Sequence, residues 1–330
     1  MRPPRSIQMI LLLIRVEDRH LAALRAAAPG ARVISFADAK EMAEKIGAFL
    51  PEAEVILANP YRDRTHVTEI LNAPRLRWIQ QRSAGANWLM DYPQAVESDL
   101  IVTNASGLHA IPISEHILAL MLCLARDIHR SVREQAARRW NRVHRLTELD
   151  GQTMGLIGLG AVGEKTAQKA RGLNMRVLGV RRHPGRPTPW VERVYGPENL
   201  MEMLPLVDWL VITAPLTPET QGMIGEKELR AMKKSAHVIN ISRGPLIQEQ
   251  TLIRALREGW IAGAGLDVFE EEPLPASSPL WDMENVIITA HYAGATPNYH
   301  ERALAIFLDN LRRYKAGEPL RNVVDKTLGY

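Results

Sequence analysis

Short apolar runs alternate with helical patterns along the first 105 residues. The runs that resemble buried strands are residues 9–14, 33–36, 55–58, 76–80 and 100–102. The stretch between the second and third of them, residues 39–49, has the spacing of a helix. Alternation of this kind predicts an α/β domain in which helices cover a parallel sheet.

The same rhythm returns after a break between Ser106 and Pro112. There a helix is expected to begin at Ser114, and it is apolar almost all round, so we predict that it is buried between two domains. Further strands are predicted at residues 153–157, 176–180, 209–212, 238–241, 261–266 and 286–289. These predict a second doubly wound parallel sheet. A last helix, residues 299–314, is expected to return to the first domain.

Composition narrows the class of protein. A chain of 330 residues is long for one core and suggests two domains. The net charge of +4 is spread without a Lys/Arg-rich run, so we expect no nucleic-acid partner. No apolar run is long enough to span a membrane, so no membrane association is expected. The single cysteine, Cys123, excludes a disulfide framework and favours a reducing cytoplasm. We expect no metal site.

A glycine-rich turn, G-L-G-A-V-G, follows the predicted strand 153–157 and precedes a helix that starts near Ala161. Gly158 would permit the tight turn, Gly160 would let a pyrophosphate approach the backbone, and Gly163 would bring the helix close to its strand. The unpaired amides of the helix would then face the phosphates. Strand, turn and helix in this order predict a dinucleotide site.

The end of the next strand indicates which dinucleotide binds. Arg181 lies 181 − 163 = 18 residues after the last glycine, and Arg182 follows it. An NAD site has an acidic residue here for the ribose 2′-hydroxyl, whereas a 2′-phosphate needs a cation. We therefore predict NADP as the cofactor, with NAD possible. The alternative is that both arginines form a solvent-exposed basic pair.

Ionisable residues follow three predicted strands of the second domain: Arg243, Glu272 and His291. Because the carboxyl ends of parallel strands share one edge, these side chains form a candidate site beside the cofactor. An imidazole can protonate a carbonyl oxygen, a carboxylate can orient it, and a guanidinium can hold a substrate carboxylate. The alternative is a structural histidine and a solvated acidic turn.

Two more features fit such a site. Asp267 lies close enough to its strand end to reach a nicotinamide amide. The small-residue loop 81–87 could offer backbone amides to an anion, although it could equally be a plain turn from strand to helix. Together, these residues predict hydride transfer between a nicotinamide cofactor and a 2-keto or 2-hydroxy acid.

The motifs I-N-I-S-R-G at 239–244, G-L-D-V-F-E-E-E-P at 265–273 and T-A-H-Y-A-G at 289–294 resemble the D-isomer-specific 2-hydroxyacid dehydrogenase family. The resemblance extends to R-W-I-Q-Q-R-S-A-G-A-N at 77–87 and P-I-S-E-H at 112–116. It implies a flavodoxin-like substrate domain, residues 1–105 and 295–330, into which a Rossmann cofactor domain, residues 106–294, is inserted. It also implies a homodimer formed through the cofactor domain, and closure of the two domains around the substrate.

Residue by residue, the resemblance makes Arg243, Glu272 and His291 the catalytic residues. It gives Ala84 and Gly85 the role of binding the substrate carboxylate through backbone amides. The further positions that match cofactor contacts of the family are Ala161, Val162, Thr213, Pro215, Thr220, Ile241 and Asp267.

Within the family, Arg181 resembles the NADPH-dependent glyoxylate and hydroxypyruvate reductase branch. Glu272 argues against formate dehydrogenases, which carry glutamine there. Two alternatives stay open: a dinucleotide-sensing binding protein like the C-terminal-binding protein corepressors, and a short NAD-dependent phosphoglycerate dehydrogenase. Trp140, the one large aromatic of the arginine-rich segment 126–145, is either a subunit contact or core.

Overall fold

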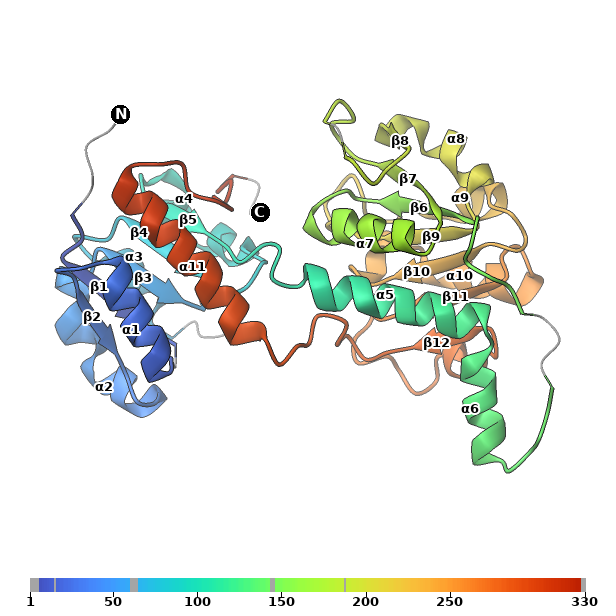
Figure 1. Cartoon of the computed structure of the whole chain (residues 1–330), viewed down its shortest axis with the longest axis horizontal. Helices are drawn as coiled ribbons and strands as arrows, with labels where there is room; N and C mark the ends of the chain where they lie inside the picture. The colour runs from blue at the N-terminus through green and yellow to red at the C-terminus, as the bar shows by residue number, and fades with distance from the viewer. Residues whose placement is uncertain (1–5, 15, 60–64, 143–145, 187, 328–330) are drawn as a thin grey trace. The chain divides into compact units, whose positions relative to one another are not determined.

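The computed structural model describes residues 6–14, 16–59, 65–142, 146–186 and 188–327. The chain forms two compact units, shown in Figure 1. Unit 1 comprises Met1–Leu108 and Pro297–Tyr330, and unit 2 comprises His109–Thr296. The first unit is therefore built from both ends of the chain, and the second from its middle.

Unit 1 contains a parallel sheet in the order β2-β1-β3-β4-β5, which is the flavodoxin-like order. Its strands are β1 (Met9–Leu12), β2 (Arg32–Ser35), β3 (Val55–Ala58), β4 (Trp78–Gln81) and β5 (Ile101–Thr103). Its helices are α1 (Asp18–Ala27), α2 (Ala39–Phe49), α3 (Val67–Leu71), α4 (Pro93–Glu97) and α11 (Tyr299–Ala316).

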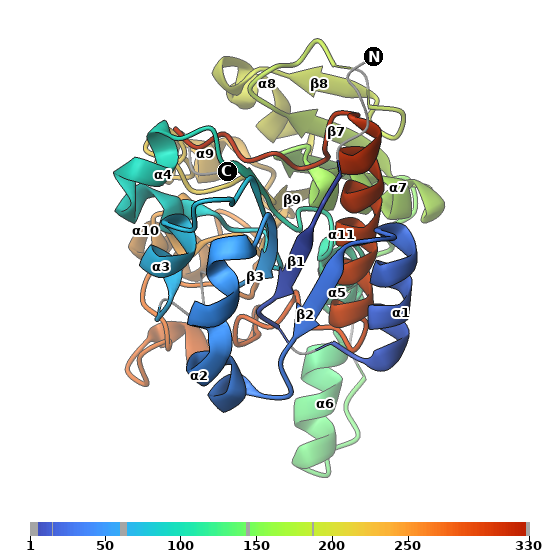
Figure 2. The same cartoon turned by 90° about the vertical axis from the view of Figure 1, so that its left-hand side faces the viewer.

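Helices cover both faces of this sheet (Figure 2). Along β1, Ile10 and Leu12 pack under α1 and α11, whereas Leu11 between them packs under α2 and α3. The three side chains are fully buried. A strand covered on both faces is apolar at every position, which is why these strands appear in the sequence as continuous apolar runs.

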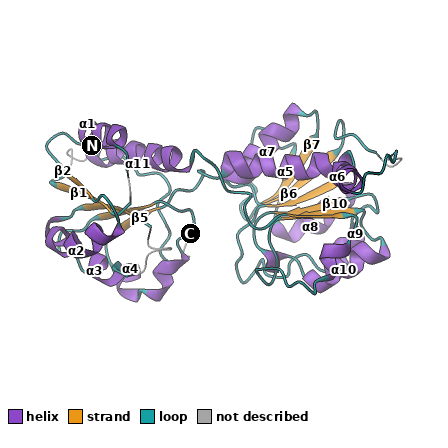
Figure 3. Cartoon of the chain, turned by 90° about the horizontal axis from the view of Figure 1, so that it is seen from below, coloured by secondary structure: helices purple, strands orange, loops and turns teal. Residues whose placement is uncertain are grey.

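Unit 2 contains a parallel sheet in the order β12-β11-β10-β9-β6-β7-β8. Its strands are β6 (Thr153–Ile157), β7 (Arg176–Val180), β8 (Arg193–Tyr195), β9 (Trp209–Ile212), β10 (His237–Asn240), β11 (Gly263–Leu266) and β12 (Val286–Ile288). Its helices are α5 (Ala110–Ala125), α6 (Ile128–Ala136), α7 (Ala161–Gly172), α8 (Leu200–Met203), α9 (Glu226–Ala231) and α10 (Glu249–Glu258). Figure 3 shows α5 and α7 on one face of this sheet and α8, α9 and α10 on the other.

The strand order reverses between β6 and β9, so the glycine turn after β6 lies at the switch point of a Rossmann sheet. The prediction of two doubly wound parallel sheets is confirmed. The pattern missed β8, because only one of its three residues is buried and it forms no apolar run. It also missed α6, which lies inside the arginine-rich segment.

The start and the burial of α5 differ from the prediction. The helix begins at Ala110 rather than Ser114, and Pro112 lies in its first turn, where a missing amide costs no helical bond. The Ser114 hydroxyl donates back to the carbonyl of Ile111 (2.9 Å). One face packs on α7, β10 and β11, but Leu122 is 40% exposed, so the helix is not buried all round.

In the part of the chain that the structure describes, no helix is both long and apolar enough to cross a membrane.

Candidate active site

The turn between β6 and α7 requires its glycines for different reasons. Gly158 has a φ of +99°, and a Cβ there would lie 2.6 Å from the amide nitrogen of Ala214. A Cβ on Gly163 would lie 2.1 Å from the carbonyl oxygen of Gly158. Above Gly160, by contrast, a Cβ would meet nothing within 4 Å. Gly158 and Gly163 are therefore needed by the fold, whereas Gly160 leaves open space that a ligand could fill.

Amides without a partner in the helix follow Gly160 directly in the chain. Within α7 the amide of Glu164 donates to the carbonyl of Gly160 (2.8 Å). The preceding amides, those of Ala161, Val162 and Gly163, belong to the first turn and have no acceptor within the helix. Donors at a helix N-terminus, with the helix dipole behind them, suit an anion such as a pyrophosphate. The residues present therefore fit a dinucleotide.

The loop after β9 supports this turn. Thr213 donates its hydroxyl to the carbonyl of Gly158 (2.7 Å), and Thr220 donates its own to the carbonyl of Pro215 (2.8 Å). Both threonines thus fix loop backbone. Ile241 is 7% exposed at the end of β10. The structure brings these predicted residues to the carboxyl edge of the sheet that carries the glycine turn.

At the end of β7, the predicted cations have acidic neighbours. Arg181 donates to the Glu164 carboxylate (3.1 Å), and only 11% of its side chain is exposed. Arg182 lies 3.9 Å from the carboxylate of Glu219, in an exposed pair. Burial and the fixed acceptors around Arg181 make the first pair the stronger of the two, because exposed pairs contribute little.

Arg243, Glu272 and His291 follow neighbouring strands. Asn240 of β10 is in register with Leu266 of β11, and Leu266 with Ile288 of β12. Gly244 lies directly against the next segment, since a Cβ there would be 1.9 Å from the carbonyl carbon of Phe269. This close approach places Arg243 beside the segment that carries Glu272.

The imidazole of His291 is paired with the carboxylate of Glu272. Its Nδ1 lies 2.6 Å from Oε2, and the other carboxylate oxygen accepts the amide of Phe269 (3.0 Å). His291 has a φ of +52°, a region that side chains other than glycine rarely adopt. Strained backbone of this kind is concentrated at functional sites. With Nδ1 occupied, Nε2 is the ring nitrogen that can exchange a proton with a ligand.

Asp267, which is predicted to reach a nicotinamide amide, is also bonded within the protein. It is 1% exposed, and its carboxylate accepts the Thr289 hydroxyl (2.5 Å) and the amides of Tyr292 (3.1 Å) and Ala293 (3.0 Å). A buried carboxylate with this many donors is a fixed anchor. Asp267 therefore holds the backbone directly after His291 and the Thr289 side chain before it.

His116 completes this anchor, a role that the sequence does not predict. Its Nε2 lies 3.0 Å from the Thr289 hydroxyl and 3.8 Å from the Asp267 carboxylate. Burial lowers the pKa of His116, and the charge of Asp267 offsets part of that shift. The motif P-I-S-E-H at 112–116 contains His116, but the sequence does not show which loop a histidine on a helix contacts.

In unit 1, the loop after β4 directs its carbonyls into the domain. The carbonyl of Arg82 accepts the Tyr299 hydroxyl (3.0 Å), and that of Ala84 accepts the Asn104 side chain (2.9 Å). The side chain of Gln81 donates to the carbonyls of Ser83 and Gly85. Among the described residues, no acceptor is recorded for the amides of residues 83–86. The loop thus presents a row of N–H groups, which suits a carboxylate.

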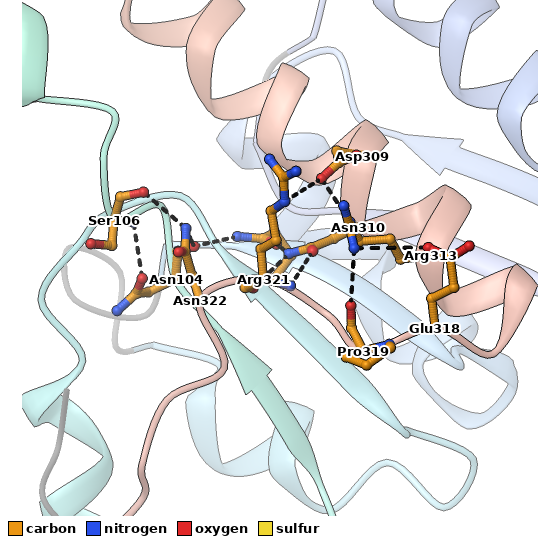
Figure 4. A network of polar contacts seen from close by, with 10 residues as sticks. Asn104, Ser106, Asp309, Asn310, Arg313, Glu318, Pro319, Arg321 and Asn322 are labelled. Atoms are coloured by element: carbon orange, nitrogen blue, oxygen red, sulfur yellow. Dashed lines mark hydrogen bonds and ion pairs between the residues drawn. The ribbon is translucent and has the colours of Figure 1, made fainter. Parts of the chain in front are cut away.

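The C-terminal segment holds Asn104, which supports this loop, in place (Figure 4). Asn310 is fully buried and bonds the backbone of Arg321 in both directions (3.0 and 2.8 Å). Asn322 then donates to the carbonyls of Ser106 (2.8 Å) and Asn104 (3.3 Å). Asn104 is thereby fixed from behind while its side chain supports Ala84.

Within the described residues, no group of three or more His, Cys, Asp or Glu side chains could hold a metal ion.

Comparison with known proteins identifies the family. Residues 118–293 match the family described as D-isomer specific 2-hydroxyacid dehydrogenase, NAD binding domain. The chain is 36% identical over 262 residues to a glyoxylate reductase of Korarchaeum cryptofilum, covering 77% of each protein. It is 33% identical over 289 residues to a D-3-phosphoglycerate dehydrogenase of Methanocaldococcus jannaschii, covering 87% of this chain and 53% of that protein.

A solved structure agrees with these matches. The NADPH-dependent glyoxylate/hydroxypyruvate reductase of Sinorhizobium meliloti, in complex with NADP and sulfate, superposes with a TM-score of 0.77. It is 25% identical, and the similarity covers 98% of this chain and 100% of that one. The chain belongs to the D-isomer-specific 2-hydroxyacid dehydrogenase family. It is an NAD(P)-dependent oxidoreductase, and unit 2 contains its NAD-binding domain.

Proposed function

We propose that this protein reduces a small 2-keto acid, of the glyoxylate or hydroxypyruvate type, to the D-2-hydroxy acid with NADPH. The observation that carries the proposal is the His291–Glu272 pair at the strand edge that also holds the glycine turn. The glyoxylate reductase and glyoxylate/hydroxypyruvate reductase relatives support this substrate class.

A bound reduced nicotinamide supplies the hydride for the carbonyl carbon. His291 gives a proton from Nε2 to the carbonyl oxygen, while Glu272 fixes the ring through Nδ1. Loss of that proton leaves a neutral imidazole that must be protonated again before the next turnover. Asp267 keeps the backbone around His291 in its left-handed conformation.

Arg243 binds the substrate carboxylate. Its guanidinium is exposed, and it donates to the carbonyl of Ser242 (2.7 Å). Among the described residues, no carboxylate lies within ion-pair distance of it. A planar guanidinium with donors to spare matches a carboxylate. Ala84 and Gly85 offer further donors through their backbone amides.

NADPH is the proposed cofactor because Arg181 and Arg182 stand where an NAD site carries an acid. The reductase of Sinorhizobium meliloti, which binds NADP, supports this choice. NADH is the alternative cofactor. Gly158, Gly160 and Gly163, with the first turn of α7, hold the pyrophosphate.

The protein is further proposed to form a homodimer through unit 2. Apolar side chains are exposed on α5 and α6 and on the segments around them: Leu122, Ile128, Val132, Trp140 and Leu146. Trp140 is 95% exposed, so it does not lie in the core of unit 2. Exposed apolar groups of this number favour a protein contact.

The test is a substrate panel in which oxidation of NADPH and NADH is followed by absorbance. Glyoxylate and hydroxypyruvate should be turned over, and more efficiently with NADPH. The phosphoglycerate dehydrogenase relative makes NAD-dependent oxidation of D-3-phosphoglycerate the necessary comparison. Faster turnover of that substrate would replace the proposal. Tight dinucleotide binding with no turnover of any 2-keto acid would favour the corepressor-like alternative.

A further inference from the structure

One of the two arginines at the end of β7, Arg181, is already paired with a carboxylate of the protein. The guanidinium of Arg181 donates to the Glu164 carboxylate (3.1 Å), to the carbonyl of Leu159 (2.5 Å) and to the carbonyl of Arg186 (3.1 Å). Only 11% of the Arg181 side chain is exposed, against 36% of that of Glu164. The more accessible charge of this pair is therefore the negative one.

Glu164 lies on the first turn of α7, immediately after the last glycine of the turn. Its partner Arg181 lies at the strand end, where the adenosine ribose binds in a Rossmann domain. The pair thus places a carboxylate beside the end of β7, where the strand itself is not followed by an acidic residue. A carboxylate there can accept a hydrogen bond from a ribose hydroxyl, whereas it repels a 2′-phosphate.

We propose that Glu164 is a cofactor-selectivity residue: its carboxylate, held against Arg181, favours the ribose hydroxyl of NADH and opposes the 2′-phosphate of NADPH. The inference rests on the dinucleotide site of the proposed function. It implies that selectivity for NADPH is weaker than two consecutive arginines suggest. Removing the charge of Glu164 while keeping its shape should therefore strengthen NADPH binding relative to NADH.

The experiment compares Glu164→Gln with wild type in titrations of NADPH and of NADH, followed by tryptophan fluorescence and without substrate. The ratio of the NADH Kd to the NADPH Kd should rise by roughly threefold to tenfold, where tenfold corresponds to about 1.4 kcal/mol. Because salt screens partly exposed charges, the change in this ratio should shrink in about 1 M salt. Glu164→Asp keeps the charge and should stay near the wild-type ratio.

Glu192→Gln is the matched control. Glu192 pairs with Arg176 (2.7 Å) at the opposite end of β7, and this pair is exposed. Its removal should leave the ratio unchanged. An unchanged ratio in Glu164→Gln, or weaker NADPH binding relative to NADH, would overturn the inference while leaving the proposed activity intact. A wild-type protein that binds neither dinucleotide would overturn both.

Discussion

Nδ1 of His291 lies 2.6 Å from the carboxylate of Glu272, although 19 residues separate them in the chain. The contact depends on backbone geometry at both ends. His291 is held at a positive φ, and Glu272 accepts the amide of Phe269. The pair therefore fixes which imidazole nitrogen faces a ligand, and its two members should act as one unit in catalysis.

Replacing Glu272 should damage catalysis more than cofactor binding. Glu272→Gln removes the charge that orients and supports the imidazole, so kcat should fall by about tenfold to a hundredfold. The NADPH Kd should change little. Glu271→Gln alters an exposed neighbour and serves as the control. Equal kcat in the two variants would remove Glu272 from the proposed mechanism.

Gly160→Ala should separate cofactor binding from folding. A methyl group there meets nothing in the protein within 4 Å, so the melting temperature should stay near that of wild type. It would occupy the space proposed for the pyrophosphate, so affinity for both dinucleotides should fall by about tenfold or more. Gly172→Ala, at the far end of the same helix and equally open, should bind normally. Undiminished affinity in Gly160→Ala would place the pyrophosphate elsewhere.

Asn104→Ala should weaken substrate binding, although Asn104 is not proposed to contact the substrate itself. The side chain donates to the carbonyl of Ala84 (2.9 Å) and so helps to orient the free amides of the loop. Loss of this bond is worth about 0.5–1.5 kcal/mol, so the KM for glyoxylate should rise roughly twofold to tenfold. The variant also loses the bond that the Asn104 side chain accepts from the amide of Ser106 (2.9 Å). The NADPH Kd should not move.

Asn285→Ala is the matched variant for this measurement, because it removes a comparable bond, to the carbonyl of Ala262 (3.0 Å) in unit 2. If both variants raise KM equally, the effect of Asn104 is one of general stability rather than of loop position.

Acid should destabilise unit 2 through His237. Burial lowers the pKa of His237 from 6.5 to about 4, so the folded protein keeps this ring neutral where the unfolded chain protonates it. The contribution of the neutral His237 ring to the free energy of unfolding is complete above pH 6.5 and is lost progressively as the pH falls towards 4. His237 stacks on Trp209 at 4.5 Å, and His237→Phe preserves an aromatic ring there. Urea unfolding should show a shallower loss of stability between these pH values in the variant, and parallel profiles would contradict the assignment.

Much of the fold was predictable because buried parallel strands can be recognised in the sequence. Strands buried on both faces are continuous apolar runs, and β3, β6, β7 and β9 have the predicted bounds. Elements with few buried residues form no apolar run, which is why β8 and α6 were not predicted. The predicted start of α5 is wrong because Pro112 indicates a break, although the first turn of a helix tolerates a proline.

The site was predictable as far as strand ends and motifs reach. The edge that carries Arg243, Glu272 and His291 follows from strand order. What the sequence cannot give is the partner of a side chain once the loops fold. Asp267 binds the loop around His291, and Arg181 binds Glu164, because backbone geometry brings those groups together across the sheet edge.

The most direct test of the central claim is a single turnover with His291→Asn, since asparagine tolerates the left-handed backbone of this position. Enzyme loaded with NADPH is mixed with glyoxylate, and loss of the reduced nicotinamide is followed in time. We predict that wild type oxidises its bound NADPH, and that the variant binds NADPH with similar affinity but oxidises it about a hundredfold or more slowly. Oxidation at the wild-type rate in the variant would contradict the assignment of His291 as the proton donor.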